Sequence, residues 1–302
     1  MRWGAGITCV NHAPGRAVVR HSRELHPKMG RPSVCSDARR AKHSENSIAR
    51  LAGRWHGRGV ALVEWQRELA EVYDETYAAM FEPAVLDPMV DLLLDLAEGG
   101  PVLEFAVGTG RVALPLASRG VPVQGLELSQ QMADVLGRKP GADAVQVTVG
   151  DMCSMQIPGE FTLVYVVANG LMNVTTQEEQ VAVFGNASAH LRPGGRFVVE
   201  LVVPQLQHVP PGETARVFTL EQDHVGIETF DDLVAQVAWS HHWMYSKGGL
   251  VRHSAPYRYV WPAELVLMAQ LAGFHLQSRG DWHREPFTSA SVSQVAVFEK
   301  TP

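Results

Sequence analysis

Two closely spaced glycines that follow an apolar run constrain this chain more than any other feature. Residues 102–111 read VLEFAVGTGR, and the apolar part has the composition of a strand buried on both faces of a sheet. Gly108 and Gly110 carry no Cβ and let the main chain approach a ligand. A helix behind them would offer unpaired N–H groups to an anionic group, and Glu104 adds two acceptor oxygens. The segment therefore predicts a strand–turn–helix unit that binds a nucleotide-like ligand.

The glycine pattern alone does not identify that ligand. Gly108-x-Gly110-x-x-Ala113 fits the dinucleotide-binding fingerprint. Glu127 follows about 20 residues later, where that fingerprint places a ribose-binding acid. The choice between a nicotinamide or flavin cofactor and another adenosine-containing cofactor therefore depends on the motifs that follow in the chain.

Charge is distributed unevenly along the 302 residues. Residues 1–60 contain 12 Lys and Arg against 3 Asp and Glu, whereas the rest of the chain contains 14 against 29. The acidic body disfavours extended nucleic-acid binding, which needs clustered basic side chains against phosphates. The hydrophobic share of 46% is ordinary for a globular protein, and the length fits one large domain or two small ones.

The sequence predicts neither a membrane segment nor a metal site. No uninterrupted apolar run approaches the ~20 residues that span a bilayer, and no apolar stretch of the signal-peptide kind is present. Cys9, Cys35 and Cys153 have no metal-ligand spacing and form no even disulfide framework. We therefore expect a cytoplasmic protein in a reducing compartment.

Residues 1–60 differ from the rest of the chain in composition and periodicity as well as in charge. They are rich in Arg, His, Ser and Gly and lack sustained periodicity. Such a composition buries too little apolar area to offset chain entropy. We predict a basic, disordered N-terminal extension, or a segment outside the native product if translation begins later. A transit peptide or a basic nucleic-acid-binding arm is the alternative.

From about Leu62 onward, strand-like and helix-like segments alternate. The expected strands are residues 102–107, 121–126, 144–149, 161–167, 196–203, 274–279 and 293–298. The expected helices are residues 62–81, residues 88–97, a segment that ends at Arg119, a segment opened by Ser129 as N-cap, a segment from the capping box at Thr176 to Leu191, and a segment that starts at Pro262. This alternation predicts parallel β/α units with helices on both faces of one sheet.

An antiparallel insert interrupts the alternation. Residues 225–231, 235–245 and 250–260 are expected to form three strands joined by short turns. The predicted domains are therefore a ligand-binding α/β domain at residues 61–204, a small β insert at residues 205–261 that acts as a lid, and a completion of the sheet by residues 262–302.

Four short motifs, taken in order along the chain, resemble those of a known family. They are EFAVGTGR at 104–111, GLELSQQM at 125–132, GDM at 150–152 and LRPGG at 191–195. In order and spacing they resemble the class I methyltransferases that depend on S-adenosyl-L-methionine, over most of residues 65–300. The second and third motifs look like the small-molecule branch. The resemblance implies a Rossmann-like, doubly wound, seven-stranded sheet whose last strand is antiparallel.

The resemblance also implies how the methyl donor is held. Glu104 would lie near the amino end of the methionine moiety, and Tyr73 over the same end. Glu127 would accept hydrogen bonds from both ribose hydroxyls. Asp151 would accept from the adenine 6-amino group, and the Met152 N–H would reach a ring nitrogen.

The remaining residues expected to bind the donor line the turn and the adenine. Those expected from the resemblance are Ala106, Gly108, Thr109, Gly110, Leu128, Met132 and Val167. Arg111 follows this turn, at a position where many relatives have a small or varied residue, and receives no fixed role.

Electrostatics favour S-adenosylmethionine over a dinucleotide. Glu104 would crowd a pyrophosphate that carries two negative charges, whereas the ammonium of a methionyl group forms a charge-assisted hydrogen bond with it. A nicotinamide-dependent oxidoreductase and a protein that binds S-adenosylmethionine without catalysis remain the alternatives. The predicted reaction is an in-line displacement that moves a methyl group to nitrogen or oxygen of a small molecule.

The sequence offers only weak candidates for catalysis. A hydroxyl acceptor would need a general base, for which the candidates are His241, His242, His253 and Asn169. Adjacent histidines on a strand should point to opposite faces. The aromatic residues of the insert suit a lid over a cationic or flat acceptor, and Trp282 and Phe287 could add to that wall. The same insert fits equally a seam against the main sheet or against a second copy in a homodimer.

Overall fold

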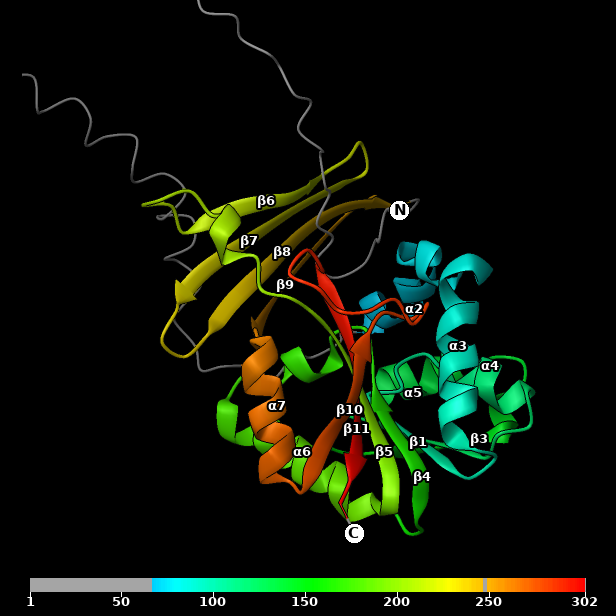
Figure 1. Ribbon diagram of the computed structural model, residues 1–302. Coiled ribbons are helices and arrows are strands. Elements are labelled where there is room, and N and C mark those ends of the chain that lie inside the picture. The colour runs from blue at the N-terminus through cyan, green and yellow to red at the C-terminus, as the bar shows by residue number, and fades with distance from the viewer. Residues whose placement is uncertain (1–66, 247–248, 302) are drawn as a thin grey trace, which may run out of the picture. The chain divides into compact units, whose positions relative to one another are not determined.

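Nearly continuous apolar strands build a central sheet (Figure 1). The computed structural model describes residues 67–246 and 249–301, so the extension predicted at residues 1–60 lies outside the described residues. The strands of this sheet are β1 (Val102–Phe105), β2 (Val123–Glu127), β3 (Val145–Val149), β4 (Phe161–Val166), β5 (Leu191–Val202), β10 (Phe274–Gly280) and β11 (Ser293–Lys300). Every residue of β1 and β4 is buried, as a sheet covered on both faces requires.

The strand order confirms the predicted doubly wound fold. The seven strands follow the order β10-β11-β5-β4-β1-β2-β3. Neighbouring strands from β5 to β3 are parallel, whereas β11 is antiparallel to both β5 and β10. The order reverses between β1 and β4, and in open α/β sheets the crevice at such a point, beyond the carboxyl ends of the strands, is the usual ligand site.

Helices cover both faces of the sheet (Figure 1). They are α2 (Arg67–Thr76), α3 (Pro83–Ala97), α4 (Ala113–Ser118), α5 (Gln130–Gly137), α6 (Gln177–His190) and α7 (Pro262–Leu271). One hydrophobic core joins α6 and α7 to the sheet through residues such as Phe184 and Leu265. The other joins α3, α4 and α5 through Leu93, Leu116 and Leu136. Each such side chain contributes about 1.5–3 kcal/mol on burial, so both faces are firmly held.

Local sequence signals set most helix starts. The Ser129 hydroxyl accepts from the Met132 N–H at 3.3 Å, and the Thr176 hydroxyl accepts from the Glu179 N–H at 3.2 Å. Both predicted N-caps are therefore confirmed. The helix expected at residues 88–97 instead begins at Pro83, because a proline is favoured in the first turn and Pro83 precedes Pro88 there.

The helix expected at residues 62–81 ends earlier than predicted. α2 ends at Thr76 and is followed by a 3₁₀ turn, η2 (Ala78–Phe81). The Tyr77 ring packs on Tyr73 with ring centroids 4.7 Å apart. Residues 62–66 lie outside the described part of the chain.

A second, antiparallel sheet forms where an insert of three strands was expected. Its four strands are β6 (Ala215–Leu220), β7 (His224–Asp232), β8 (Val237–Ser246) and β9 (Gly249–Arg258), in that order. β6 was missed because it is an edge strand with one buried residue, Phe218, and so shows no alternation. Phe230, Ala238 and Tyr257 join the core beside α6 and α7, so the second sheet is anchored on the first. No helix among the described residues is long and apolar enough to cross a membrane.

Candidate functional site

The glycine turn after β1 has the conformation that only a few residue types tolerate. Ala106, Gly108 and Gly110 have φ values of 54°, 57° and 82°. A Cβ on Gly110 would come within 2.9 Å of the Leu136 side chain, so this glycine permits close packing of the turn on α5. A Cβ on Gly108 would meet nothing nearer than Met132 Cε at 3.8 Å. A methyl group at Gly108 would therefore make only ordinary van der Waals contacts, and glycine is required here by the positive φ rather than by crowding.

Glu127 ends β2 beside this turn and is held by two main-chain groups. Its Oε2 accepts from the Gly108 N–H at 2.8 Å, and its Oε1 accepts from the Ser129 N–H at 2.9 Å. Burial raises the pKa of the carboxyl, which these hydrogen bonds oppose. Each oxygen keeps a second lone pair, so the aligned carboxylate can accept from two neighbouring hydroxyl groups of a ligand.

Glu104 is the more deeply buried acid and has one side-chain donor. It is 2% exposed and lies directly across from Tyr165 in the pairing of β1 with β4. The Tyr165 hydroxyl donates to Oε2 at 2.8 Å. Burial raises the pKa of Glu104 to about 8, although the Tyr165 bond, the nearby Arg111 charge and the Ala113 N–H all lower it. Tyr165 was not predicted, because the pairing of two strands 61 residues apart leaves no trace in the sequence.

Tyr73 and Arg111 lie at the same end of the site. Burial raises the pKa of Tyr73, the Arg111 charge lowers it, and the charges of Asp74 and Glu127 raise it. Arg111 also acts on the pKa of Glu104. The structure therefore brings three of the predicted residues, Tyr73, Glu104 and Glu127, within electrostatic reach of one another, and adds Arg111.

A hydrogen bond ties the glycine turn to α2. The Thr109 hydroxyl donates to Asp74 Oδ1 at 2.6 Å, and Asp74 also forms an ion pair with Lys139 beyond the end of α5. Thr109 is 2% exposed, so its hydroxyl proton is used in the hydrogen bond to Asp74. Thr109 thus positions the turn, and Asp74 is a supporting residue that sequence analysis missed.

Asp151 is exposed at the end of β3, and the loop behind it is fixed by α6. Asp151 Oδ1 accepts from the Cys153 N–H at 2.8 Å. The Asn186 amide donates to the carbonyls of Met152 and Met155 at 2.9 Å and 3.0 Å. His190 Nε2 accepts from the Ile157 N–H at 2.8 Å. Asn186 and His190 carry no motif signal, because they act on main-chain groups of a distant loop.

The two apolar residues expected at the adenine differ in burial. Leu128 is 47% exposed although it directly follows a buried strand, whereas Met132 is 4% exposed in the first turn of α5. Leu128 is thus accessible to a ligand beside Glu127, whereas Met132 is part of the buried packing.

The loop after β4 is held by β5 and the C-terminal region. Ala168 and Asn169 both adopt positive φ values, 52° and 61°. The Ala168 N–H donates to Glu200, which also accepts from the Trp282 indole, each at 2.8 Å. Asn169 Oδ1 accepts from the Val202 N–H at 2.8 Å. Asn169 and Trp282 therefore have structural contacts here, and the buried Val167 lies directly before this loop.

The three candidate histidines lie in the second sheet. His241 stacks beside Trp239, on the face opposite His242, as the alternation predicts. His242 contacts His224 at 2.9 Å and Ser240 at 2.8 Å, and burial lowers its pKa to about 3. His253 pairs with His242 across β8 and β9. These contacts do not involve the residues expected to bind the donor, and the described residues include no cluster of acidic, His and Cys side chains that could hold a metal.

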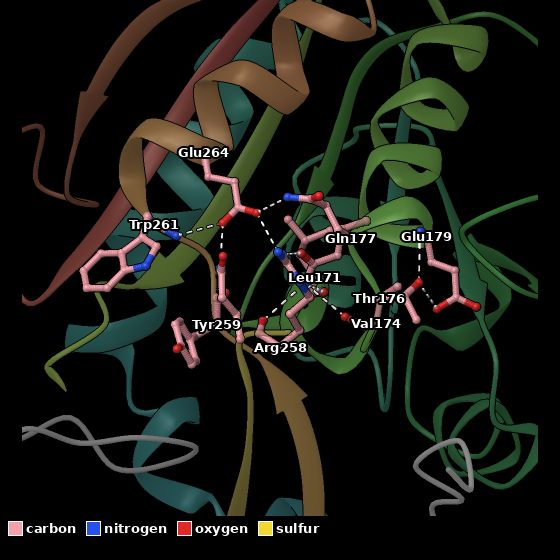
Figure 2. A network of polar contacts seen from close by, with 11 residues as sticks. Leu171, Val174, Thr176, Gln177, Glu179, Arg258, Tyr259, Trp261 and Glu264 are labelled. Carbon is pink, nitrogen blue, oxygen red and sulfur yellow. Dashed lines mark hydrogen bonds and ion pairs between the residues drawn. The ribbon is translucent and has the colours of Figure 1, made fainter. Parts of the chain in front are cut away.

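An ion pair between Arg258 and Glu264 connects the end of β9 to α7 (Figure 2). Arg258 at the end of β9 donates to Glu264 Oε1 at 2.6 Å, and the Gln177 amide donates to the same oxygen at 2.7 Å. The Gln236 amide donates to Oε2 at 2.8 Å. Burial alone would raise the pKa of Glu264, but the bonds from Gln236, Arg258 and Gln177 lower it.

Gln180 extends this network to the loop after β4. Its Oε1 accepts from Arg258 at 2.6 Å, and its amide donates to the Leu171 and Val174 carbonyls at 3.2 Å and 3.0 Å (Figure 2). Leu171 belongs to η4 (Gly170–Asn173). The network therefore links the second sheet to the loop after β4.

Comparisons with known proteins identify methyltransferases as the relatives of this chain. A family described as a methyltransferase domain matches residues 102–195. The solved CcbJ methyltransferase from Streptomyces caelestis is 34% identical at a TM-score of 0.67, over 78% of this chain and 96% of that chain. The cypemycin N-terminal methyltransferase of a Streptomyces species is 25% identical over 239 residues, which are 76% of this chain and 98% of the relative. S-adenosylmethionine-bound CalS10, an amino pentose methyltransferase from Micromonospora echinaspora, shares the fold at a TM-score of 0.51 and 21% identity, over 84% of this chain and 97% of that chain.

Proposed function

The chain belongs to the class I S-adenosylmethionine-dependent methyltransferases, and from this premise we propose that it methylates nitrogen or oxygen of a small molecule. The family expected from the sequence is thereby confirmed. The acceptor class is supported by what relatives act on: an amino pentose for CalS10 and, by its name, a peptide N-terminus for the cypemycin enzyme.

The observation that carries the donor site is the placement of three carboxylates along one sheet edge. Glu104 belongs to β1, Glu127 ends β2 and Asp151 follows β3. These strands are parallel neighbours, so their carboxyl ends meet at the same edge. The acids differ in burial, with Glu104 and Glu127 inside and Asp151 exposed. Such a row suits a ligand with a cationic end, a sugar and a base, and would repel a pyrophosphate.

Each part of the donor has a matching group in this row. Glu104 would hold the ammonium of the methionyl end through a charge-assisted hydrogen bond. Glu127, already aligned by Gly108 and Ser129, would accept from the ribose hydroxyls. Asp151 would accept from the adenine amino group, and Leu128 would cover the ring. Gly108, which carries no Cβ, would let the donor approach the main chain of the turn.

The bound donor supplies an electrophilic methyl group on a sulfonium, and the protein contributes orientation. Holding the acceptor in line with the methyl group turns a bimolecular reaction into an effectively unimolecular one. Tyr73 and the loop at Val167 would border the methyl end. The second sheet, anchored through Arg258 and Gln180, would exclude water and shape the acceptor pocket. An amine acceptor that arrives neutral needs no protein base. Asn169, one of the candidates for that base, instead accepts a main-chain hydrogen bond from Val202.

The other features expected from the sequence remain predictions. We propose a cytoplasmic enzyme with a free small molecule as acceptor, rather than nucleic acid or a membrane component. The domain limits at residues 61–204, 205–261 and 262–302 and a homodimer are predictions of the same standing.

Binding and transfer measurements test this proposal in sequence. Isothermal titration calorimetry should detect S-adenosylhomocysteine at micromolar concentration and no binding of NAD or NADP. Methyl transfer from labelled S-adenosylmethionine should then be found in a panel of amino sugars and small peptides. Binding of a dinucleotide without binding of S-adenosylhomocysteine would overturn the donor assignment. Donor binding without transfer to any member of the panel would favour a binding protein.

A further inference from the structure

Arg111 is a buried cation whose hydrogen bonds within the described structure are weak. The side chain directly follows Gly110 in the glycine turn and is 9% exposed. One guanidinium nitrogen, Nη1, lies 3.5 Å from the Met80 carbonyl and 4.0 Å from the Met89 sulfur. Both distances are long for charge-assisted contacts, which are about 2.7–2.9 Å when formed with an oxygen anion.

No carboxylate of the described residues forms an ion pair with Arg111 within 4.0 Å. By contrast, the buried Arg258 pairs with Glu264 and the partly buried Arg216 pairs with Glu228, at 2.6 Å each. A buried charge is costly unless it is paired. Arg111 therefore differs from both of these arginines in having no anionic partner within the described part of the chain.

The surroundings of Arg111 contain the predicted contacts of the methionyl end. Its charge acts on Tyr73, Glu104 and Tyr165. The Ala113 N–H, two residues after Arg111, donates to the Glu104 carboxyl. Glu104 and Arg111 are thus both buried and within electrostatic reach of each other, without forming an ion pair. A ligand that carries one ammonium and one carboxylate would pair with both.

Resting on the donor site of the proposed function, we propose that Arg111 binds the carboxylate of the methionyl end while Glu104 binds its ammonium. Glu104 and Arg111 carry opposite single charges, and the amino-acid end of the donor is a zwitterion. The four charges therefore cancel within the buried site. A site with Glu104 alone would leave the ligand carboxylate buried beside a like charge, which is unfavourable.

The distinguishing experiment compares two ligands that differ only in that carboxylate. These are S-adenosylhomocysteine and its decarboxylated analogue, S-adenosyl-3-thiopropylamine, and affinities are measured by calorimetry without any methyl acceptor. The native chain should prefer the carboxylate-bearing ligand by about 10- to 100-fold, as loss of a charge-assisted hydrogen bond predicts. In Arg111→Gln the preference should fall below about threefold, through weaker binding of S-adenosylhomocysteine alone.

Two controls separate recognition from a merely structural role. Arg111→Lys keeps the charge and should retain part of the preference. Arg119→Gln alters an exposed arginine that pairs with Asp91 at 3.2 Å and should change neither affinity. Equal weakening of both ligands in Arg111→Gln would assign Arg111 to packing and overturn the proposal.

The native chain alone also tests the proposal, even if the variants do not fold. Equal affinity of the native chain for the two ligands would overturn the role of Arg111 while leaving the donor site intact. Failure of the native chain to bind either ligand would instead overturn the proposed function.

Discussion

The Tyr165 hydroxyl donates to Oε2 of Glu104 at 2.8 Å across the pairing of β1 with β4, and both side chains are fully buried. Burial of the carboxyl raises the pKa of Glu104 to about 8, although the Tyr165 hydroxyl, the Arg111 charge and the Ala113 N–H lower it. The ligand-free chain therefore holds Glu104 largely protonated at neutral pH, ready to ionise when an ammonium arrives.

The first prediction concerns stability. In the unfolded chain Glu104 loses its proton near pH 4.5, whereas the folded chain retains it up to about pH 8. The folded state therefore binds more protons in this interval, and the contribution of Glu104 to stability falls as pH rises through it. Glu104→Gln removes this loss and should stabilise the ligand-free chain by on the order of 2–3 kcal/mol at pH 7, but little at pH 4.5. Urea unfolding at both pH values measures the difference, and a gain that is the same at pH 4.5 and pH 7 would contradict the assignment.

A second prediction concerns ligand binding. Because an ammonium favours ionised Glu104, binding should release a proton below pH 8. The affinity for S-adenosylhomocysteine should therefore rise with pH between 5.5 and 7.5, by up to about tenfold per unit. Calorimetry in buffers of different ionisation enthalpy measures the proton release. The Glu104→Gln variant should bind weakly with no such slope, and an unchanged slope in that variant would assign the proton to another group.

A third prediction tests Asp151. Its carboxylate is exposed, and its contacts within the described loop are with the N–H and the side chain of Cys153. Asp151→Ala should leave the free energy of unfolding within about 0.5 kcal/mol and weaken S-adenosylhomocysteine binding by about 1–3 kcal/mol. For an analogue of S-adenosylhomocysteine whose base has a 6-oxo group in place of the 6-amino group, Asp151→Ala should cause no loss of affinity, because that base has no amino group to donate to Asp151. Asp143→Ala, which changes an exposed acid before the opposite end of β3, is the matched control, and equal affinity of Asp151→Ala and native protein would remove Asp151 from the site.

The fourth prediction concerns the anchor of the second sheet. Arg258 is buried and Glu264 is partly buried, so Arg258→Met leaves the Glu264 charge without its cation and should destabilise the chain by about 1.5–3 kcal/mol, the value of a hydrogen bond to a charged group. Arg119→Met breaks an exposed pair and should cost less than about 1 kcal/mol. Chemical unfolding of both variants measures the contrast. A similar small effect in both would show that the Arg258–Glu264 pair does not hold the sheet.

The part of the site that could be predicted consists of residues whose role is local. Gly108 and Gly110 follow from the turn, Ser129 from helix capping, and Glu127 from its place at a strand end, because each depends on neighbours a few residues away. The fourth strand of the second sheet was missed for the complementary reason: β6 is an edge strand, and Phe218 is its one buried residue.

The sequence by itself determined the α/β class, the glycine turn, the order of the acidic residues and the methyltransferase family, because hydrophobic periodicity and short motifs indicate each of them. Only the tertiary structure decided which side chains support them. Tyr165 meets Glu104 through strand pairing, Asn186 holds the Asp151 loop from a distant helix, and Arg111 comes to lie beside Glu104 without pairing with it. These relationships depend on register and packing between segments far apart in the chain, and no local pattern encodes them.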